Sequence, residues 1–578
     1  MKTISLKTGI FLLLAASVIT AHAGNTDTFV KATYGTVRTL DPAVVYDTTS
    51  GSRVRNLYET LIFFDGEATD KFVPLLATEV PTVKNAGISG DGKTYTFKIR
   101  TGVKFHNGAE MTPEDVAYSF KRNMIADPDG GPQWMILEAL TGEGSTRDDG
   151  AIIAGIFDKI DKSVEVKGDK VIFHLPRPYP PLMGILAYAS SSIMDKDWAI
   201  KNGAWDGKLA SAAKFNNPAA NEEPLKKVAN GTGAYSLKAW EPSKQFVFER
   251  FDGYWGEKPA IKTAIVKYVP EWTTRKLMLQ NGDADTVTVD NIHYPEVAAM
   301  SNIDIFKVPQ LSVSSIFFNR TINPTGNADI GSGKLDGNGI PPDFFADENV
   351  RKAFAHSMDW QSYKTEVGNG LIEIPSSPNV TGLPYHKDVP IYKYDLAKAA
   401  EHLKKAFGGE VWEKGFKMTI THNTGNELRE AAAHMMAENV SSLNPKFQIE
   451  VRNVEWKDYL VKYRSFAYPI FIIGWGADYP DSHNFIYTFM HSKGVYGRYV
   501  GYKNARVDEL ASAGIETTDP VKREKIYSEL QQLWYEEIPG VTIYQPVLVK
   551  PYLKGTKGFV PNAMFSDAYE LFRVMHKE

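Results

Sequence analysis

The chain has 578 residues, of which 43% are hydrophobic and 12% aromatic, and its formal net charge is −4. Because this mild acidic charge is spread without long runs, it argues against nucleic acid as the main partner. The absence of cysteine excludes disulfides, thiolate metal sites, cysteine nucleophiles and a lipid-bearing N-terminal cysteine. The length exceeds that of one usual domain, so we expect two or three lobes.

The N-terminus has the three parts of a secretory signal peptide. Lys2 and Lys7 supply positive charge, residues 10–19 are apolar apart from one serine, and Ala-His-Ala at 21–23 forms a small-x-small cleavage site. The apolar stretch is shorter than the ~20 residues that span a bilayer, and a buried first helix is the alternative. We expect residues 1–23 to be a signal peptide cleaved after Ala23. Since no lipid-bearing cysteine would tether the mature chain, we expect it in the periplasm of a Gram-negative bacterium.

Four segments have the pattern of strands. Over 93–100, apolar residues alternate with polar ones, which is typical of a half-buried strand. The stretches 246–248, 265–269 and 470–473 are apolar and β-branched or aromatic, which predicts buried strands.

Three helices are predicted by their start signals. Thr112 is a capping residue, and the Pro113 that follows it suits the first helical position. Asp395 starts a second helix, which glycines at 408–409 should end. Asn426 starts a third, whose expected core residues are Leu428, Ala431, Ala432 and Met435. Strands and helices together predict an α/β protein.

No catalytic motif is visible. The sequence lacks a His-Glu-x-x-His helix, a Gly-x-Ser-x-Gly elbow and a Gly-x-Gly-x-x-Gly loop, and its histidines are not at metal-ligand spacing. Asp478 and Asp481 form the only candidate acid/base pair, as in a secreted hydrolase. Neighbouring aspartates in a loop are more often turn formers, so we expect no catalytic residue, no cofactor and no metal.

Several segments, taken in chain order, are similar to the family 5 extracellular solute-binding proteins, which bind dipeptides, oligopeptides or nickel for ABC transporters. The matching segments are DGKTYTFKIR (91–100), GVKFHNG (102–108), TPEDV (112–116), NGTGAY (230–235, where the family usually has proline at 234), ER (249–250), YWGEKP (254–259), TTR (273–275), GDAD (282–285), FFN (317–319), VRKAF (350–354) and GWGADYP (474–480). Matches run from about residue 34 to 545.

The resemblance implies a two-lobed Venus flytrap that closes over its ligand about two hinge strands. One lobe would be subdivided, which gives three domains. Domain I would comprise 24–56, 190–288 and 545–578, domain II 57–189, and domain III 289–544. The closed form would be the one that the permease recognises. The implied partners are a small peptide or similar polar solute and the ABC permease with its ATPases, and a monomer is expected.

The resemblance also assigns ligand-binding residues. In peptide binders the aspartate after the Gly-Trp strand receives the ligand's α-ammonium group, and the matching residue is Asp478. A ligand backbone would add to the edge of the strand at 314–319, nearest Ser314 and Ser315. Further candidates are Trp475 beside the aspartate, which either contacts ligand or packs in the core, and Tyr46, Thr48 and Thr49 in a loop that faces the cleft in relatives.

One departure concerns the ligand's carboxylate. Dipeptide binders carry an arginine where this chain has Asn423, and the spacing of Arg429 makes it a poor substitute. A fixed carboxylate clamp is therefore not expected. We predict an oligopeptide ligand, with an oligosaccharide, opine or other non-peptide solute as the alternative. A sugar would stack on tryptophan and be hydrogen-bonded by asparagine, and the candidates for these contacts are Trp475, Trp456 and Asn423. A peptide-holding chaperone would be a further class.

Overall fold

The computed structural model describes residues 25–219, 221–565 and 569–578. The expected signal peptide and its cleavage site lie outside these residues. Within them, no helix combines the length and the apolar character needed to cross a membrane.

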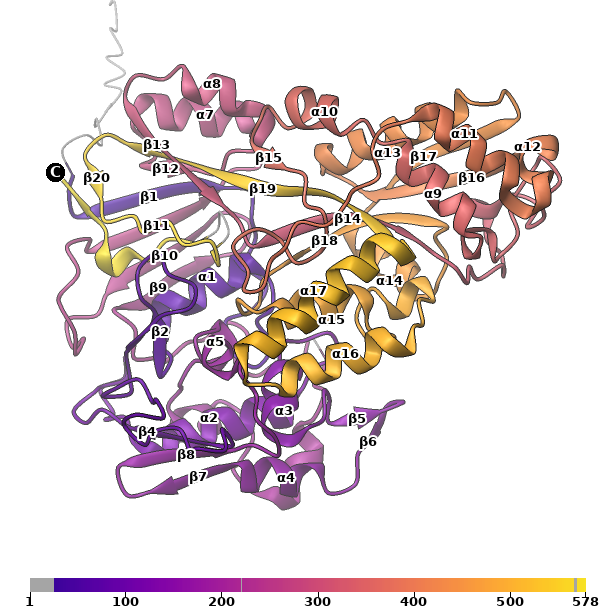
Figure 1. Ribbon diagram of the computed structural model, residues 1–578. Helices are drawn as coiled ribbons and strands as arrows, with labels where there is room; N and C mark the ends of the chain where they lie inside the picture. The colour runs from indigo at the N-terminus through magenta and orange to yellow at the C-terminus, as the bar shows by residue number, and fades with distance from the viewer. Residues whose placement is uncertain (1–24, 220, 566–568) are drawn as a thin grey trace, which may run out of the picture.

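A twelve-stranded mixed sheet extends across the upper part of the molecule in the view of Figure 1. Its strand order is β17-β16-β18-β14-β19-β12-β1-β11-β10-β9, and β13 and β15 pair with β19 beside this path. The bounds are β1 Thr28–Thr33, β9 Tyr235–Glu241, β10 Gln245–Arg250, β11 Thr263–Tyr268, β12 Thr286–Val287, β13 Ile303–Pro309, β14 Ser312–Phe318, β15 Ile372–Glu373, β16 Phe416–Asn423, β17 Phe447–Val454, β18 Ile470–Gly476 and β19 Gly540–Leu553. The three predicted buried strands are confirmed as β10, β11 and β18.

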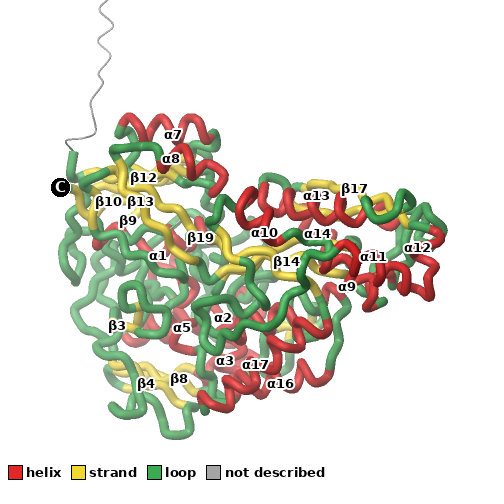
Figure 2. The backbone as a smooth tube through the Cα atoms, turned by 45° about the horizontal axis from the view of Figure 1, so that its top comes forward, coloured by secondary structure: helices red, strands yellow, loops and turns green. Residues whose placement is uncertain are grey.

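Helices and small sheets cover both ends of this sheet (Figure 2). The helices are α1 Thr48–Leu57, α2 Pro113–Ala126, α3 Trp134–Thr141, α4 Ile156–Ser163, α5 Leu182–Leu186, α6 Lys196–Lys201, α7 Trp272–Asn281, α8 Tyr294–Ala298, α9 Glu348–His356, α10 Trp360–Ser362, α11 Leu396–Lys405, α12 Glu410–Lys414, α13 Glu427–Ser441, α14 Trp456–Arg464, α15 Ser482–Met490, α16 Ala505–Glu516 and α17 Pro520–Glu537. The small sheets are β2 Ile62–Phe64 with β3 Phe72–Pro74, β4 Thr94–Lys98 with β8 Lys170–His174 and β7 Val164–Lys167, β5 Arg147–Asp148 with β6 Ala151–Ile152, and β20 Thr556–Lys557 with β21 His576–Lys577.

The buried apolar residues divide the chain into two bodies. Lobe 1 denotes residues 25–310 and 546–578, and lobe 2 denotes residues 311–545. One large cluster fills most of lobe 1, from Phe29 to Met575, and two clusters fill lobe 2, one on each face of its strands. The expected two-lobed α/β architecture is confirmed.

An antiparallel ribbon joins the lobes. β19 pairs first with β13, from Ile303–Leu553 to Pro309–Val547, and then with β14. At the crossing, the Gln310 backbone N–H donates to the Pro546 carbonyl at 3.0 Å. The chain crosses between the lobes twice here, between β13 and β14 and within β19, as expected for two hinge strands. Among the described strands, β19 is the only one with residues in both lobes.

The local start signals are confirmed. The strand expected at 93–100 is β4, and α2 begins after Thr112, whose backbone N–H donates to Asp115 Oδ2 at 2.8 Å. Asp395 and Asn426 cap α11 and α13 with their side chains.

The predicted buried face of α13 is shifted by one residue. Ala432 is buried as expected, but the other buried positions are Ala433, Met436, Ala437 and Val440. The expected residues at 428, 431 and 435 are half-buried at the border of the same core. Because adjacent helical stripes overlap at Ala432, the sequence period alone did not decide which stripe faces β16 and β17.

Candidate functional site

Asp478 lies in the loop between β18 and α15, at the boundary between the lobes. Its carboxylate is buried and accepts hydrogen bonds from Tyr46 Oη at 2.9 Å and Asn484 Nδ2 at 3.4 Å. Among the described residues, no cationic side chain forms an ion pair with it. Burial raises the pKa of the Asp478 carboxyl to about 7, and the two hydrogen bonds offset only part of this effect. The site therefore holds a carboxylate that lacks a cationic partner.

Tyr46 brings lobe 1 to this carboxylate. Its hydroxyl accepts a hydrogen bond from Trp134 Nε1 at 3.0 Å, which leaves its own proton to be donated to Asp478. Burial and the neighbouring Asp478 raise the pKa of Tyr46 well above its ordinary value, so the phenol stays protonated. The Tyr188 ring packs edge-on against Tyr46 with centroids 6.4 Å apart. The contacts of Trp134 and Tyr188 with Tyr46 could not be predicted from the sequence, because each of these residues lies about 90 or more positions from Tyr46.

The two threonines of the same loop are less involved. Thr48 and Thr49 form the first turn of α1, where Asp47 is the capping residue. Thr48 is exposed and Thr49 half-buried. Among the described residues, no hydrogen bond joins either hydroxyl to Asp478.

Arg429 lies against two of the predicted ligand residues. Its Nε and Nη2 each donate to Ser314 Oγ at 3.2 Å, and its Nη1 donates to Asn423 Oδ1 at 2.7 Å. The close approach depends on Gly474 in β18, since a Cβ atom there would lie 2.7 Å from both Arg429 Nη2 and Ser314 Oγ. The guanidinium thus occupies the end of β14 and β18.

Arg429 lies closer to Asn423 than its spacing in the sequence suggested. Asn423 ends β16 and Arg429 sits in the first turn of α13, so the short turn between them folds the long side chain back onto the strand ends. Every hydrogen bond that Arg429 donates within the described structure ends on a neutral oxygen. A cation in the first turn of a helix is locally unfavourable, and this is the signal that sequence reasoning missed.

Ser315 and Trp475 lie on the opposite face of the sheet from Ser314. Successive residues of a strand point to opposite faces, and Ser315 is fully buried beside the aromatic core of lobe 2. Trp475 packs at the edge of this core, with its ring edge-on to Tyr496 at 5.9 Å. Its Nε1 donates to Asn484 Oδ1 at 3.0 Å, and the same oxygen accepts the Asp478 backbone N–H. Trp475 is therefore linked to Asp478 through Asn484, whereas Ser315 is not.

We expected the ligand backbone to pair with the edge of the strand at 314–319, and the pairing of β14 contradicts this expectation. β14 is an interior strand: it pairs with β18 over 312–318 and with β19 over 314–317. Both of its edges are occupied there, so a ligand backbone cannot add to them.

Asp481 is held by structural contacts. It caps α15 by accepting the His483 backbone N–H at 2.9 Å, and it forms a buried ion pair with Arg523 at 2.8 Å. Its carboxylate is thereby unavailable as the second member of an acid/base pair with Asp478. In the part of the chain that is described, no cluster of three or more His, Asp or Glu side chains is arranged to hold a metal ion.

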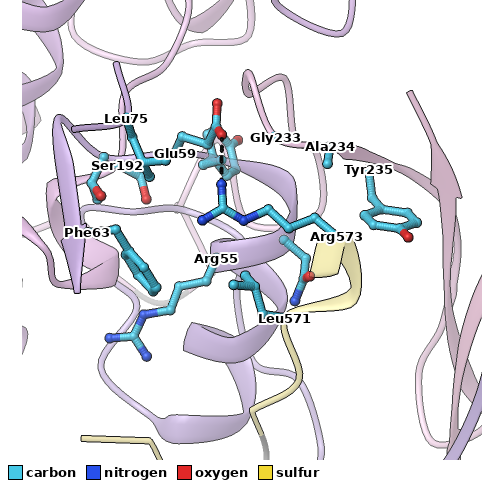
Figure 3. A pocket seen from close by; sticks show the side chains of 13 residues that line it. Arg55, Glu59, Phe63, Leu75, Ser192, Gly233, Ala234, Tyr235, Leu571 and Arg573 are labelled. Atoms are coloured by element: carbon cyan, nitrogen blue, oxygen red, sulfur yellow. Dashed lines mark ion pairs between the residues drawn. The ribbon is translucent and has the colours of Figure 1, made fainter. Parts of the chain in front are cut away.

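A separate hollow lies within lobe 1, lined by α1 and the C-terminal segment (Figure 3). Arg573 points toward Glu59, with Nη1 3.6 Å from the carboxylate, while Arg55 points away from it. None of the predicted ligand residues lines this hollow.

Comparison with known proteins agrees with this architecture. The family model described as "Bacterial extracellular solute-binding proteins, family 5 Middle" matches residues 71–497. The chain is 26% identical to the dipeptide-binding protein of Escherichia coli (strain K12), over 98% of this chain and 99% of that protein. It is 26% identical to the oligopeptide-binding protein AppA of Bacillus subtilis (strain 168), over 79% of this chain and 76% of that protein.

Solved structures share the fold. The periplasmic binding protein DppA from Helicobacter pylori, in complex with the peptide STSA, superposes with a TM-score of 0.73 at 24% identity, over 95% of this chain and 98% of that one. AppA from Bacillus subtilis, in complex with a nonapeptide, superposes with a TM-score of 0.72 at 22% identity, over 95% of this chain and 99% of that one. With a family model that matches most of its length, the chain belongs to family 5 of the bacterial extracellular solute-binding proteins.

Proposed function

We propose that this protein is the substrate-binding component of an ABC importer and captures short peptides with free termini between its two lobes. The observation that carries the proposal is a pair of opposite charges without charged partners among the described residues: the Asp478 carboxylate and the Arg429 guanidinium. A peptide with a free amino group and a free carboxylate supplies the complement of both.

The ammonium end belongs at Asp478. A charge-assisted hydrogen bond to a carboxylate in a water-poor cleft is stronger than one between neutral groups, and it offsets the desolvation of the buried charge. Tyr46 and Asn484 both donate to Asp478 Oδ2, which leaves Oδ1 for the ligand.

The carboxylate end belongs at Arg429. A guanidinium recognises a carboxylate in a two-bond fork, and here its weak hydrogen bonds to Ser314 at 3.2 Å are the ones a carboxylate would replace. Gly474, beside Arg429, is four residues from Asp478, so their Cα atoms are at most about 14 Å apart. An extended chain of about four residues covers that span, which favours di- to tetrapeptides.

The cellular setting follows from the family and the sequence. We infer export to the periplasm by the 1–23 signal peptide, delivery of the closed form to a membrane permease, and a monomeric state. The names of the similar proteins, which include dipeptide- and oligopeptide-binding proteins, support a peptide solute. The three-domain division at 56/57, 189/190, 288/289 and 544/545 is part of this proposal.

The test is native mass spectrometry with chemically blocked peptides. Mature protein purified from periplasm is incubated with a casein digest below 1 kDa, either untreated, N-acetylated or amidated at its carboxylates. We expect the untreated digest to give the strongest adducts of peptide mass and each blocked digest to give much weaker ones. We expect Asp478→Asn to lose them, whereas Asp388→Asn, a change at a side chain that is 92% exposed, keeps them. No adducts with the untreated digest, or adducts of equal intensity with the N-acetylated or the amidated digest, would refute the proposal.

A further inference from the structure

The residue after the ligand-binding aspartate is buried in the opposite lobe. Tyr479 belongs to lobe 2 by sequence, but its side chain is fully buried within the core cluster of lobe 1. Its ring lies against Trp134 of α3, with centroids 6.2 Å apart. The following Pro480 packs on α5, where a Cβ atom added at Gly184 would lie only 3.0 Å from Pro480 Cδ and 3.2 Å from Tyr479 Cβ.

A second contact between the same surfaces comes from the end of α16. Ile515 is 1% exposed and is also part of the lobe 1 core cluster. The next residue, Glu516, pairs with Arg177 at 2.8 Å, and Arg177 pairs at the same time with Glu138 of α3 at 3.1 Å. Both views of the backbone place α16 beside α3 (Figures 1 and 2).

We propose that Tyr479, Pro480, Ile515 and Glu516 form a catch on lobe 2 that docks on the α3–α5 surface of lobe 1 and holds the two lobes closed. In this assignment Tyr479 is a positioning residue, since docking its ring places the adjoining Asp478 against Tyr46. The docking contact depends on shape and apolar burial, so the contact itself does not depend on which solute binds. Its coupling to the ligand rests on the proposed binding of an ammonium group at Asp478.

The physical basis is the fit of an aromatic side chain into a space kept open by glycine. When the lobes separate, the Tyr479 and Ile515 side chains become exposed to water, which opposes opening. Gly184 has no side chain in the way, so the loop can approach the α5 backbone closely. Arg177 and Glu516 are 30% and 49% exposed, so their pair at the rim contributes less than the buried contact.

Coupling to the ligand follows from the chain order. Asp478 and Tyr479 are adjacent, so docking of the Tyr479 ring also removes the Asp478 carboxylate from water. Burying this carboxylate without a cation is unfavourable. A cation bound at Asp478 offsets that cost and thereby favours closure of the catch. Ligand binding and lobe closure are thereby linked through two neighbouring residues.

The test measures the distance between the lobes directly. Because the chain has no cysteine, spin labels can be placed cleanly at Lys162→Cys on lobe 1 and Lys503→Cys on lobe 2, both exposed. Double electron–electron resonance then gives the fraction of molecules at the short, closed distance, without ligand and with the casein digest. Gly184→Leu inserts a wedge under the catch, and Gly144→Leu is its control, since nothing lies within 4 Å of a Cβ atom there.

We expect Gly184→Leu and Tyr479→Ala to reduce the closed fraction at least tenfold, while Gly144→Leu and Tyr479→Phe keep it, because Phe retains the ring. The melting temperatures of the variants serve to show that both lobes remain folded. Unchanged closure in the wedge and alanine variants would overturn the catch, as would a wild-type protein that never shows the short distance. Closure without any peptide adduct would instead count against the proposed ligand and leave the catch standing.

Discussion

The charge at Asp478 is the most informative single perturbation. Asp478→Asn keeps the size of the side chain and removes its charge. In the unliganded protein the pKa of this carboxyl is raised from its ordinary value of 3.8 to about 7, because burial disfavours the ionised form. An acidic group with a raised pKa in the folded state binds more protons in the folded state than in the unfolded state. Asp478 therefore lowers the stability of the closed, folded form progressively as the pH rises from about 4 to about 7. Above pH 7 this loss of stability stays constant.

The magnitude follows from the shift. A difference of about 3 pH units corresponds to a penalty on the order of 4 kcal/mol above pH 7, and to less than half of that at pH 5. Asp478→Asn removes this penalty, so without ligand the variant should melt at a higher temperature than the wild type, by more at pH 8 than at pH 5. With peptide this advantage should shrink or vanish, because the wild type binds peptide more tightly. Removing one partner of a buried charge pair costs about 3–5 kcal/mol, so affinity should fall by a factor between about 10² and a few times 10³.

Scanning calorimetry at pH 5 and pH 8, with and without the casein digest, measures both effects on the same samples. Asp388→Asn is the matched control, since that side chain is exposed and should show neither effect. If Asp478→Asn leaves the pH dependence of unliganded melting unchanged, the carboxylate is not desolvated as the structure indicates. If peptide stabilises the variant as strongly as the wild type, Asp478 does not receive the ammonium group.

Three further changes test other parts of the site. Arg429→Met should weaken binding of peptides with free carboxylates at least tenfold and leave amidated peptides unaffected, which titration calorimetry would show; equal losses for both would contradict the assignment. Tyr46→Phe removes a hydrogen bond to a carboxylate, which is worth about 1.5–3 kcal/mol, so we expect the pKa of Asp478 to rise further. A pH titration of its ¹³C carboxyl chemical shift measures this pKa, and an unchanged pKa would argue against the contact. Asp481→Ala leaves Arg523 buried without its partner and α15 without its cap, so melting should show a loss of about 3–5 kcal/mol, while a small loss would mean that the ion pair matters little.

Local features were predictable because neighbours in the sequence decide them. The caps at Thr112, Asp395 and Asn426 were identified correctly, since a capping side chain bonds to backbone two or three residues away. Buried strands such as β10 and β18 were visible from their composition. The family was identified from ordered motifs, and the two-lobed fold came with it.

What the sequence by itself determined is therefore a small number of the helices and strands, the family, and Asp478 as a candidate ligand residue. The tertiary structure decided that Tyr46, held by Trp134 of lobe 1, contacts Asp478. It also placed Arg429 against Ser314 and Asn423, although the spacing of Arg429 in the sequence had made it a poor substitute for the arginine of dipeptide binders. It also decided that β14 is interior, which removed the expected strand edge. The physical reason is that burial, pKa and charge pairing depend on groups brought together by packing, and their separation in sequence does not measure their distance in space.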